Sequence, residues 1–324
     1  MTPLKVSVII PAYNAEKTIA ASIRAVLAQS FHSPVELIVV DDGSTDSTAA
    51  IVRSFAEVLY FYQPNSGPAS ARNRGAAEAT GDLLFFTDAD CCPGVSWLSR
   101  MSAGFSDPLI GVVAGSYAIA NPDHALARII HAEIRFRHLQ LMPAFPRAFG
   151  SYNFSVTPDL FRRIGGFDVA YRTASGEDND ISYKVLRSGL KIRFLTDACV
   201  AHYHQTDLGK YLREQFRHGF WRFRLYADHV SMAGGDDYTF WKDIVEPPLA
   251  VAHLLVMFWP LALLALASAF MLFELLAGLW IIGFSFDGLL GGALMWLRSF
   301  SRAAGFLSGG VVFLKNRFEK GKKS

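Results

Sequence analysis

Four short apolar runs alternate with helical segments over the first 90 residues, and this alternation constrains the fold more than any other feature. The runs read VSVIIPAYN, VELIVVDD, VLYFYQ and GDLLFFTDAD. β-branched and aromatic residues dominate them, which is typical of buried strands. The segment after the first run has apolar residues at helical spacing, at Ile19, Ile23, Val26 and Leu27. The pattern predicts an α/β fold, with a mostly parallel sheet and helices on both faces.

Polar side chains stand where these predicted strands end. They are Asn14, Asp41, Asp42 and Asp88. In open parallel sheets, ligands bind beyond the carboxyl ends of the strands. We therefore expect these side chains to face one crevice.

The C-terminal third of the chain has a different character. No Asp, Glu, Lys or Arg occurs from Pro247 to Phe273, and about 20 such residues suffice to cross a bilayer. We expect a catalytic domain over residues 1–245, a membrane helical hairpin over 246–297 and an amphipathic basic tail over 298–324.

Basic residues flank this apolar tract on both sides. Those before it are Arg213, Arg217, Arg222 and Arg224, and those after it are Arg298, Arg302, Lys315, Arg317, Lys320, Lys322 and Lys323. The positive-inside bias then puts both flanks in the cytoplasm, which requires an even number of crossings. Glu274, Gly278 or Gly283 would mark the far turn. Asp287 is unfavourable inside a second crossing, so a re-entrant or surface-lying helix is the alternative.

Composition narrows the class and the compartment of the protein. A formal net charge of +2 is too small to favour nucleic-acid binding. The three cysteines lack metal-type spacing and indicate no disulfide framework, as expected in a reducing cytoplasm. The apolar run near the N-terminus is shorter than that of a signal peptide. We expect a protein of the plasma membrane or bacterial inner membrane with its catalytic domain in the cytoplasm.

Two acidic motifs follow predicted strands. In TDAD, the carboxylates of Asp88 and Asp90 can bind Mn²⁺ or Mg²⁺, although aspartates also commonly end strands. In VVDDGSTDS, a carboxylate can accept a hydrogen bond from a ribose hydroxyl or a base N–H. The DG pair is equally a common turn signal.

A third acidic motif, GEDND, precedes a helical segment. Glu177 and Asp178 can act there as a general base on an acceptor hydroxyl. Acidic residues at this position also stabilise a helix by opposing its dipole.

Together these motifs resemble the inverting family 2 glycosyltransferases, which have the GT-A fold. The matching stretches are IIPAYNAE, VVDDGSTDST, GPASARNRGAAEATGDLLFFTDAD, GGFD and GEDNDISYKVLRSG, within roughly residues 5–225. The combination is far more specific than any one motif.

The resemblance implies a role for each matching residue. The nucleotide-sugar side would comprise Pro11, Ala12, Tyr13, Asn14, Asp41, Asp42, Gly67, Arg72, Asp88 and Ala89. Asp90, with Asp88, would hold the metal that carries the diphosphate. Asp178 would be the catalytic base, and Glu177 would orient the acceptor. Asn153 and Asp168 would shape the sugar or acceptor side.

Two later segments complete the predicted site. In VAHYHQ, the resemblance makes His202 a third metal ligand, while a packed strand histidine is the alternative. The segment REQFRHGFWRFR lies where processive synthases carry QxxRW and departs from that motif, which argues against a processive polymerase. Arg217 or His218 can still reach the diphosphate, and a basic helix facing anionic lipid is the alternative.

These inferences lead to a metal-dependent glycosyltransferase of cell-surface glycan synthesis. We expect a nucleotide-sugar donor, with UDP favoured over GDP, and a membrane-associated, lipid-linked saccharide as acceptor. A nucleotidyltransferase would need a Gly-rich basic loop after the first strand, and PAYNAEKT is not one. A catalytically silent membrane scaffold would be expected to have lost Asp90 or Asp178.

Overall fold

A computed structural model describes residues 4–173, 175–232, 236–237 and 241–321. The chain forms two compact units. The sheet unit comprises Met1–Asn121 and His138–Tyr203, and the helical unit comprises Pro122–Arg137 and His204–Ser324. Residues 322–324 of the expected basic tail lie outside the described residues.

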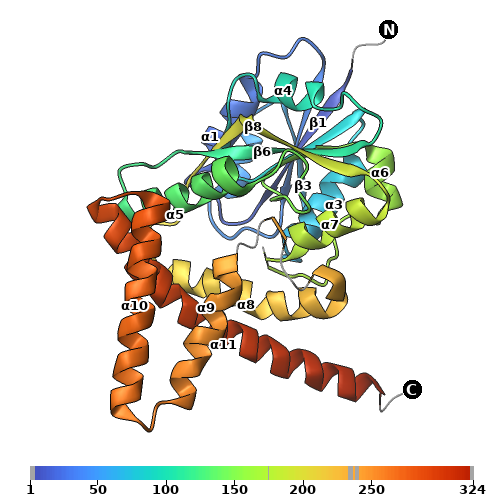
Figure 1. Ribbon diagram of the computed structural model, residues 1–324. Coiled ribbons are helices and arrows are strands. Elements are labelled where there is room, and N and C mark those ends of the chain that lie inside the picture. The colour runs from blue at the N-terminus through green and yellow to red at the C-terminus, as the bar shows by residue number, and fades with distance from the viewer. Residues whose placement is uncertain (1–3, 174, 233–235, 238–240, 322–324) are drawn as a thin grey trace. The chain divides into compact units, whose positions relative to one another are not determined.

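Eight described strands of the sheet unit form one mixed sheet in the order β3-β2-β1-β4-β7-β6-β8-β5 (Figure 1). Their bounds are β1 Val6–Ala12, β2 Val35–Asp41, β3 Val58–Tyr62, β4 Leu83–Thr87, β5 Cys91–Pro93, β6 Ile110–Ile119, β7 Asn153–Val156 and β8 Lys191–His202. The pairs β1–β2, β2–β3, β1–β4 and β6–β8 are parallel. The others, β4–β7, β6–β7 and β5–β8, are antiparallel.

Helices cover both faces of this sheet. They are α1 Ile19–Leu27, α2 Thr48–Arg53, α3 Pro68–Glu78, α4 Trp97–Ala103, α6 Pro158–Arg163 and α7 Glu177–Arg187. Because side chains alternate along a strand, Val8 and Ile10 of β1 pack with α1, α2 and α4. Ile9 packs with α3, α6 and α7 on the opposite face. The predicted α/β fold with helices on both faces is confirmed.

The helical unit contains the apolar tract. Its α-helices are α5 Ala125–Phe136, α8 Leu208–Asp228, α9 Trp241–Leu255, α10 Pro260–Ile282 and α11 Phe286–Gly321. Among the described residues, α10 alone is long and apolar enough to cross a membrane, judged by length and composition. The connection between α10 and α11 falls at Gly283–Ser285, while the apolar tract is itself broken at residues 256–259, between α9 and α10. The turn of the apolar tract therefore lies earlier than the sequence analysis expected at Glu274, Gly278 or Gly283. Glu274 lies inside α10, not in a turn.

Close backbone approaches hold these helices together. A Cβ on Gly278 of α10 would lie 2.3 Å from the carbonyl oxygen of Gly288 in α11, and one on Gly305 would lie 2.0 Å from that of Phe216 in α8. Only glycine permits such contact between helix backbones. α11 runs without a break through residue 297, where the sequence suggested a boundary between hairpin and tail. The proposed three-part division of the chain stays a prediction.

Candidate active site

The site begins at the carboxyl ends of β1, β2 and β4, which are neighbours in the sheet. Ala12 at the end of β1 pairs in register with Asp41 at the end of β2. Asn14 follows with a left-handed φ of 48°, and its side-chain oxygen accepts a hydrogen bond from the backbone N–H of Thr45 at 2.8 Å. Tyr13 is 53% exposed, whereas Ala12 is buried and Pro11 half-buried. The predicted crevice residues do converge on one edge of the sheet.

Asp41 and Asp42 are buried and bind other parts of the chain. Asp41 accepts hydrogen bonds from the N–H of Ser44 and the hydroxyl of Tyr60, both at 2.8 Å. Asp42 accepts from the N–H groups of Ser66 and Gly67, at 2.9 and 2.8 Å. These carboxylates therefore fix the loops after β2 and β3. Their predicted contacts with a nucleotide stay predictions.

Gly67 brings α3 into the site. Its φ is 92°, a conformation that favours glycine, and a Cβ there would lie 2.6 Å from the carbonyl oxygen of Arg172. Pro68 then occupies the first turn of α3, where a missing N–H costs no helical hydrogen bond. This start places Arg72 on the buried side of the helix.

Arg72 bridges the two acidic motifs that the sequence separates by about a hundred residues. One guanidinium nitrogen donates to Asp88 Oδ1 at 2.7 Å, and another donates to Glu177 Oε1 at 3.1 Å. The side chains of Arg72 and Glu177 are 2% and 3% exposed, and that of Asp88 is 29% exposed. The family resemblance implied only that Arg72 lies near the nucleotide. Its role as a bridge required the tertiary structure.

The N-terminus of α7 presents the second acidic motif. Gly176 precedes the helix with a φ of 90°, and the first turn carries Glu177, Asp178 and Asp180. The positive end of the helix dipole stabilises negative charge there. Glu177 and Asp180 are buried, whereas Asp178 is half-buried. Of these three acids, Asp178 is therefore the one whose carboxylate an acceptor can best approach.

Glu177 is buried and bound to other parts of the chain, so it is not an exposed group that could orient the acceptor directly. Its second oxygen accepts a hydrogen bond from the N–H of Ser175 at 2.7 Å, and its first binds Arg72. Burial and the charge of the adjacent Asp178 raise the pKa of Glu177 to about 7, although Arg72 acts to lower it. The carboxyl group therefore titrates near neutral pH.

This pKa predicts a pH dependence of stability. Between its ordinary pKa of 4.5 and about 7, Glu177 holds a proton in the folded chain and not in the unfolded chain. The free energy of unfolding should thus fall by about 3 kcal/mol as pH rises through that window. Glu177→Gln should remove this fall. Urea titrations at several pH values measure it, with the more exposed Glu78→Gln as control; parallel curves for wild type and Glu177→Gln would contradict the assignment.

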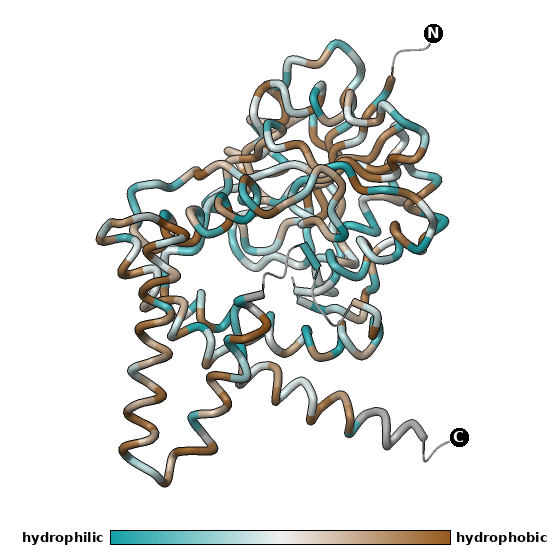
Figure 2. The backbone as a smooth tube through the Cα atoms, in the orientation of Figure 1, coloured by the Kyte–Doolittle hydropathy of each residue, from teal (hydrophilic) through white to brown (hydrophobic). Residues whose placement is uncertain are grey.

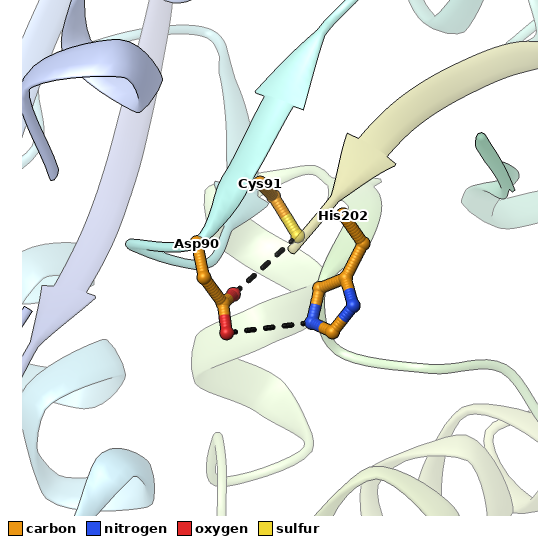
Figure 3. Close-up of side chains that lie close together, drawn as sticks. All are labelled: Asp90, Cys91 and His202. Carbon is orange, nitrogen blue, oxygen red and sulfur yellow. Dashed lines mark hydrogen bonds and ion pairs between the residues drawn. The ribbon is translucent and has the colours of Figure 1, made fainter. Parts of the chain in front are cut away.

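Asp90, Cys91 and His202 form a compact group of possible metal ligands (Figure 3). Antiparallel pairing of β5 with β8 places Cys91 opposite His202. His202 Nε2 lies 3.4 Å from Asp90 Oδ2, and Cys91 Sγ lies 3.8 Å from Asp90 Oδ1. One ligand atom from each residue falls within 4.8 Å of the others. The side chains of Asp90 and His202, which the resemblance makes metal ligands, thus lie in direct contact.

The donor chemistry of this group fits a borderline divalent cation. A carboxylate oxygen suits Mn²⁺ or Mg²⁺, and an imidazole nitrogen favours a transition metal, so Mn²⁺ fits the pair better than Mg²⁺ does. Burial, together with Asp90 and Asp88, raises the pKa of the Cys91 thiol well above its usual range, and a thiol is a weak ligand. Asp88 lies outside the group and contacts Arg72 instead. Ala89, which lies between Asp88 and Asp90 in the sequence, is buried, and its carbonyl accepts a hydrogen bond from the hydroxyl of Ser22 at 2.9 Å.

An aromatic stack supports His202. The ring of Tyr117 on β6 lies 4.9 Å from that of His202 and 3.6 Å from that of Tyr152, stacked at 12°. Sequence reasoning missed both tyrosines, because no local motif marks them.

The remaining predicted residues are more scattered. Asn153 is fully buried; it donates to the carbonyls of Ser116 and Ala198 and accepts from the indole N–H of Trp97. Asp168 is half-buried and accepts from the N–H of Ala170 at 2.9 Å. Arg217 and His218 are exposed on α8 of the helical unit. The structure gives Asn153 a scaffolding position, and the predicted roles of all four stay predictions.

Comparisons with known proteins indicate the class of protein. Residues 7–165 match the sequence model of glycosyl transferase family 2. A pre-mycofactocin glycosyltransferase of Mycobacterium tuberculosis is 30% identical over 195 residues, covering 57% of this chain and 41% of the relative. Glycosyltransferase AglE of Haloferax volcanii is 28% identical over 236 residues, covering 70% of this chain and 76% of the relative. The chain thus spans about two fifths of the length of the first relative.

A solved structure shares the fold. A mannosyltransferase from Pyrobaculum calidifontis, in complex with GDP-Man and Mn²⁺, superposes with a TM-score of 0.66 at 20% identity. The match covers 94% of this chain and 87% of that one. The fold is of the GT-A type. Residues 7–165 of the chain belong to glycosyl transferase family 2.

Proposed function

We propose that this chain transfers a sugar from a nucleotide-sugar to an acceptor hydroxyl, with inversion at the anomeric carbon. The Arg72 bridge carries the proposal, because it joins Asp88 of the donor motif to Glu177, the neighbour of Asp178. One buried guanidinium thus holds the two motifs within reach of each other. A donor bound on one side and a base on the other suit a single displacement.

On the donor side, Asp90 and His202 would hold Mn²⁺ or Mg²⁺, and Asp88 would bind the donor beside them. A bound divalent cation would stabilise the negative charge that develops on the departing diphosphate. The mannosyltransferase of the same fold was solved with GDP-Man and Mn²⁺, which supports a nucleotide-sugar and a metal here. We favour a UDP-sugar and include GDP-sugars in the test.

On the acceptor side, Asp178 would accept the proton of the attacking hydroxyl. The acceptor oxygen forms the new bond to the anomeric carbon as the bond to the diphosphate oxygen breaks. A general base contributes about 10²–10⁴-fold to such a step. Glu177 is a positioning residue in this scheme, since its oxygens bind Arg72 and Ser175.

The apolar α10 supports a membrane-associated acceptor, and we propose a lipid-linked saccharide at the cytoplasmic face of the cell membrane, made for cell-surface glycans. An enzyme and an acceptor confined to one surface meet more often than two soluble partners do.

The test is a nucleotide-sugar panel with a membrane lipid extract, purified full-length chain and product mass analysis. We expect nucleoside diphosphate release that depends on Mn²⁺ and falls at least a hundredfold in Asp90→Ala. Asp197→Ala removes an exposed carboxylate from β8, the strand that carries His202, and should leave release unchanged. Pyrophosphate release would indicate a nucleotidyltransferase, and no reaction with any donor would indicate a catalytically silent scaffold.

A further inference from the structure

The apolar hairpin, defined as residues 247–273 of α9 and α10, exposes its tip almost completely. Figure 2 shows the hairpin as a largely hydrophobic loop of chain extending from the other helices of its unit. Leu261 is 84% exposed, Phe258 80% and Leu255 72%. Such a contiguous apolar surface is rare on a soluble protein and marks an interaction site.

The hairpin ends at a cluster of buried charges. Lys242 at the start of α9 contacts Glu246 and lies 2.6 Å from Glu274 Oε2 on α10. Arg298 of α11 lies 3.6 Å from Glu246 and also binds Glu133 of α5. The side chains of Lys242, Glu246, Glu274 and Arg298 are at most 3% exposed. This charge cluster ties four helices together.

The distance from the charge cluster to the tip limits how deep the hairpin can go. The legs run from Lys242 to Leu255 and from Pro260 to Glu274, and each is about 20 Å long at the rise of an α-helix. The hydrocarbon core of a bilayer is about 30 Å thick. Pulling the tip through to the far side would draw the charge cluster into the hydrocarbon, which is costly for ionisable groups.

Several backbone N–H groups at the tip have partners within the chain. The N–H of Val256 binds the carbonyl of Ala252, that of Trp259 binds Val256, and that of Leu263 binds Trp259. Backbone groups in hydrocarbon need such internal partners. One ring nitrogen of His253 also has a local partner: its Nδ1 donates to the carbonyl of Leu249 at 2.8 Å, and its ring lies 5.1 Å from that of Phe300. Its buried Nε2 has no hydrogen-bond partner among the described residues.

We propose that the apolar hairpin inserts into the acyl region of a membrane from one side and returns to that side without crossing. Its charge cluster would lie near the headgroups, and exposed basic residues of α8 such as Arg213 and Arg217 suit an anionic membrane surface. The inference rests on the membrane association proposed above. The sequence led us to expect two full membrane crossings, and the inference puts a re-entrant hairpin in their place.

Cysteine accessibility in sealed vesicles of both orientations tests this topology. Phe258→Cys is placed in the full-length chain with Cys91, Cys92 and Cys199 replaced by alanine. Val95→Cys, at an exposed site of the sheet unit, reports the side on which that unit lies. A membrane-impermeant maleimide should label residue 95 in one orientation only. It should label residue 258 in neither until detergent dissolves the bilayer.

Each other outcome overturns the inference in a distinct way. Labelling of residue 258 only from the side opposite residue 95 shows two crossings, with membrane association intact. Labelling from the same side as residue 95 shows a hairpin outside the bilayer. Disulfide-linked dimers through residue 258 in detergent-free vesicles assign the tip to a second copy of the chain. None of these readouts depends on sugar transfer, so the topology and the proposed reaction can fail separately.

A charge placed at the tip gives an independent readout. Leu261→Asp should lower partitioning into salt-washed membranes by about a hundredfold, because aspartate is unfavourable in hydrocarbon. Val95→Asp adds the same charge to the sheet unit and should leave partitioning unchanged. Equal partitioning of Leu261→Asp and wild type would contradict insertion of the tip.

Discussion

Asp178→Asn should lower kcat for sugar transfer by about 10²–10⁴-fold, because asparagine cannot accept the proton of the attacking hydroxyl. Its shape is nearly that of aspartate, and the half-buried position at the start of α7 should tolerate it. The donor KM should change little, since the donor motifs lie on other elements. Steady-state kinetics with saturating acceptor, and donor binding by calorimetry, separate these two effects.

Asp159→Asn is the matched control for this prediction. Asp159 is also an acid in the first turn of a helix, α6, and its side chain is 89% exposed. Asp159→Asn removes a carboxylate from a helix N-terminus, as Asp178→Asn does, and this loss is worth about 0.3–1 kcal/mol of stability. We expect kcat within about twofold of wild type. A similar loss of kcat in both variants would assign the effect to the helix and not to a base.

Arg72→Ala should be the most destabilising of these substitutions. It leaves Glu177 buried beside Asp178 without its cation, and removing one partner of a buried ion pair costs about 3–5 kcal/mol. The double variant Arg72→Met with Glu177→Gln removes both charges and should recover much of that loss. Urea unfolding of Arg72→Met, Glu177→Gln and the double variant measures the coupling.

Arg74→Ala on the same helix is the control for Arg72. Arg74 pairs with Glu78 four residues away, and both side chains are at least one third exposed. Exposed pairs contribute about 0.2–1 kcal/mol, so little stability should be lost.

Because Arg72 also contacts Asp88, Arg72→Lys should raise the donor KM even where the chain stays folded: a lysine lacks the planar fork that reaches both carboxylates. An unchanged KM would argue against Asp88 on the donor side.

The strand ends were predictable because their signals are local. A run of apolar residues such as VELIVV predicts a buried strand, and the polar residue that ends the run falls at the carboxyl edge of a parallel sheet. Asn14, Asp41 and Asp88 were located in this way. Family resemblance added the acidic motif at Asp178, whose place at a helix N-terminus also follows from nearby residues.

Contacts between distant segments were not predictable in the same way. The approach of His202 to Asp90 depends on the antiparallel register of β5 with β8, which pairs Cys91 with His202. Nothing in either segment alone sets that register. The resemblance suggested His202 as a ligand, whereas the aromatic support from Tyr117 and Tyr152 had no sequence signal.

The sequence by itself determined the α/β class, the edge of the sheet where polar groups gather, and the apolar character of the C-terminal tract. These follow from periodicity and composition, which act over a few neighbouring residues. The tertiary structure decided which of those polar groups meet: Arg72 with Asp88 and Glu177, Asp90 with His202, and Lys242 with Glu274. Pairings of this kind depend on how whole elements pack. For the buried pairs, Arg72 with Glu177 and Lys242 with Glu274, the low dielectric of the interior makes the paired arrangement of the charges the favourable one.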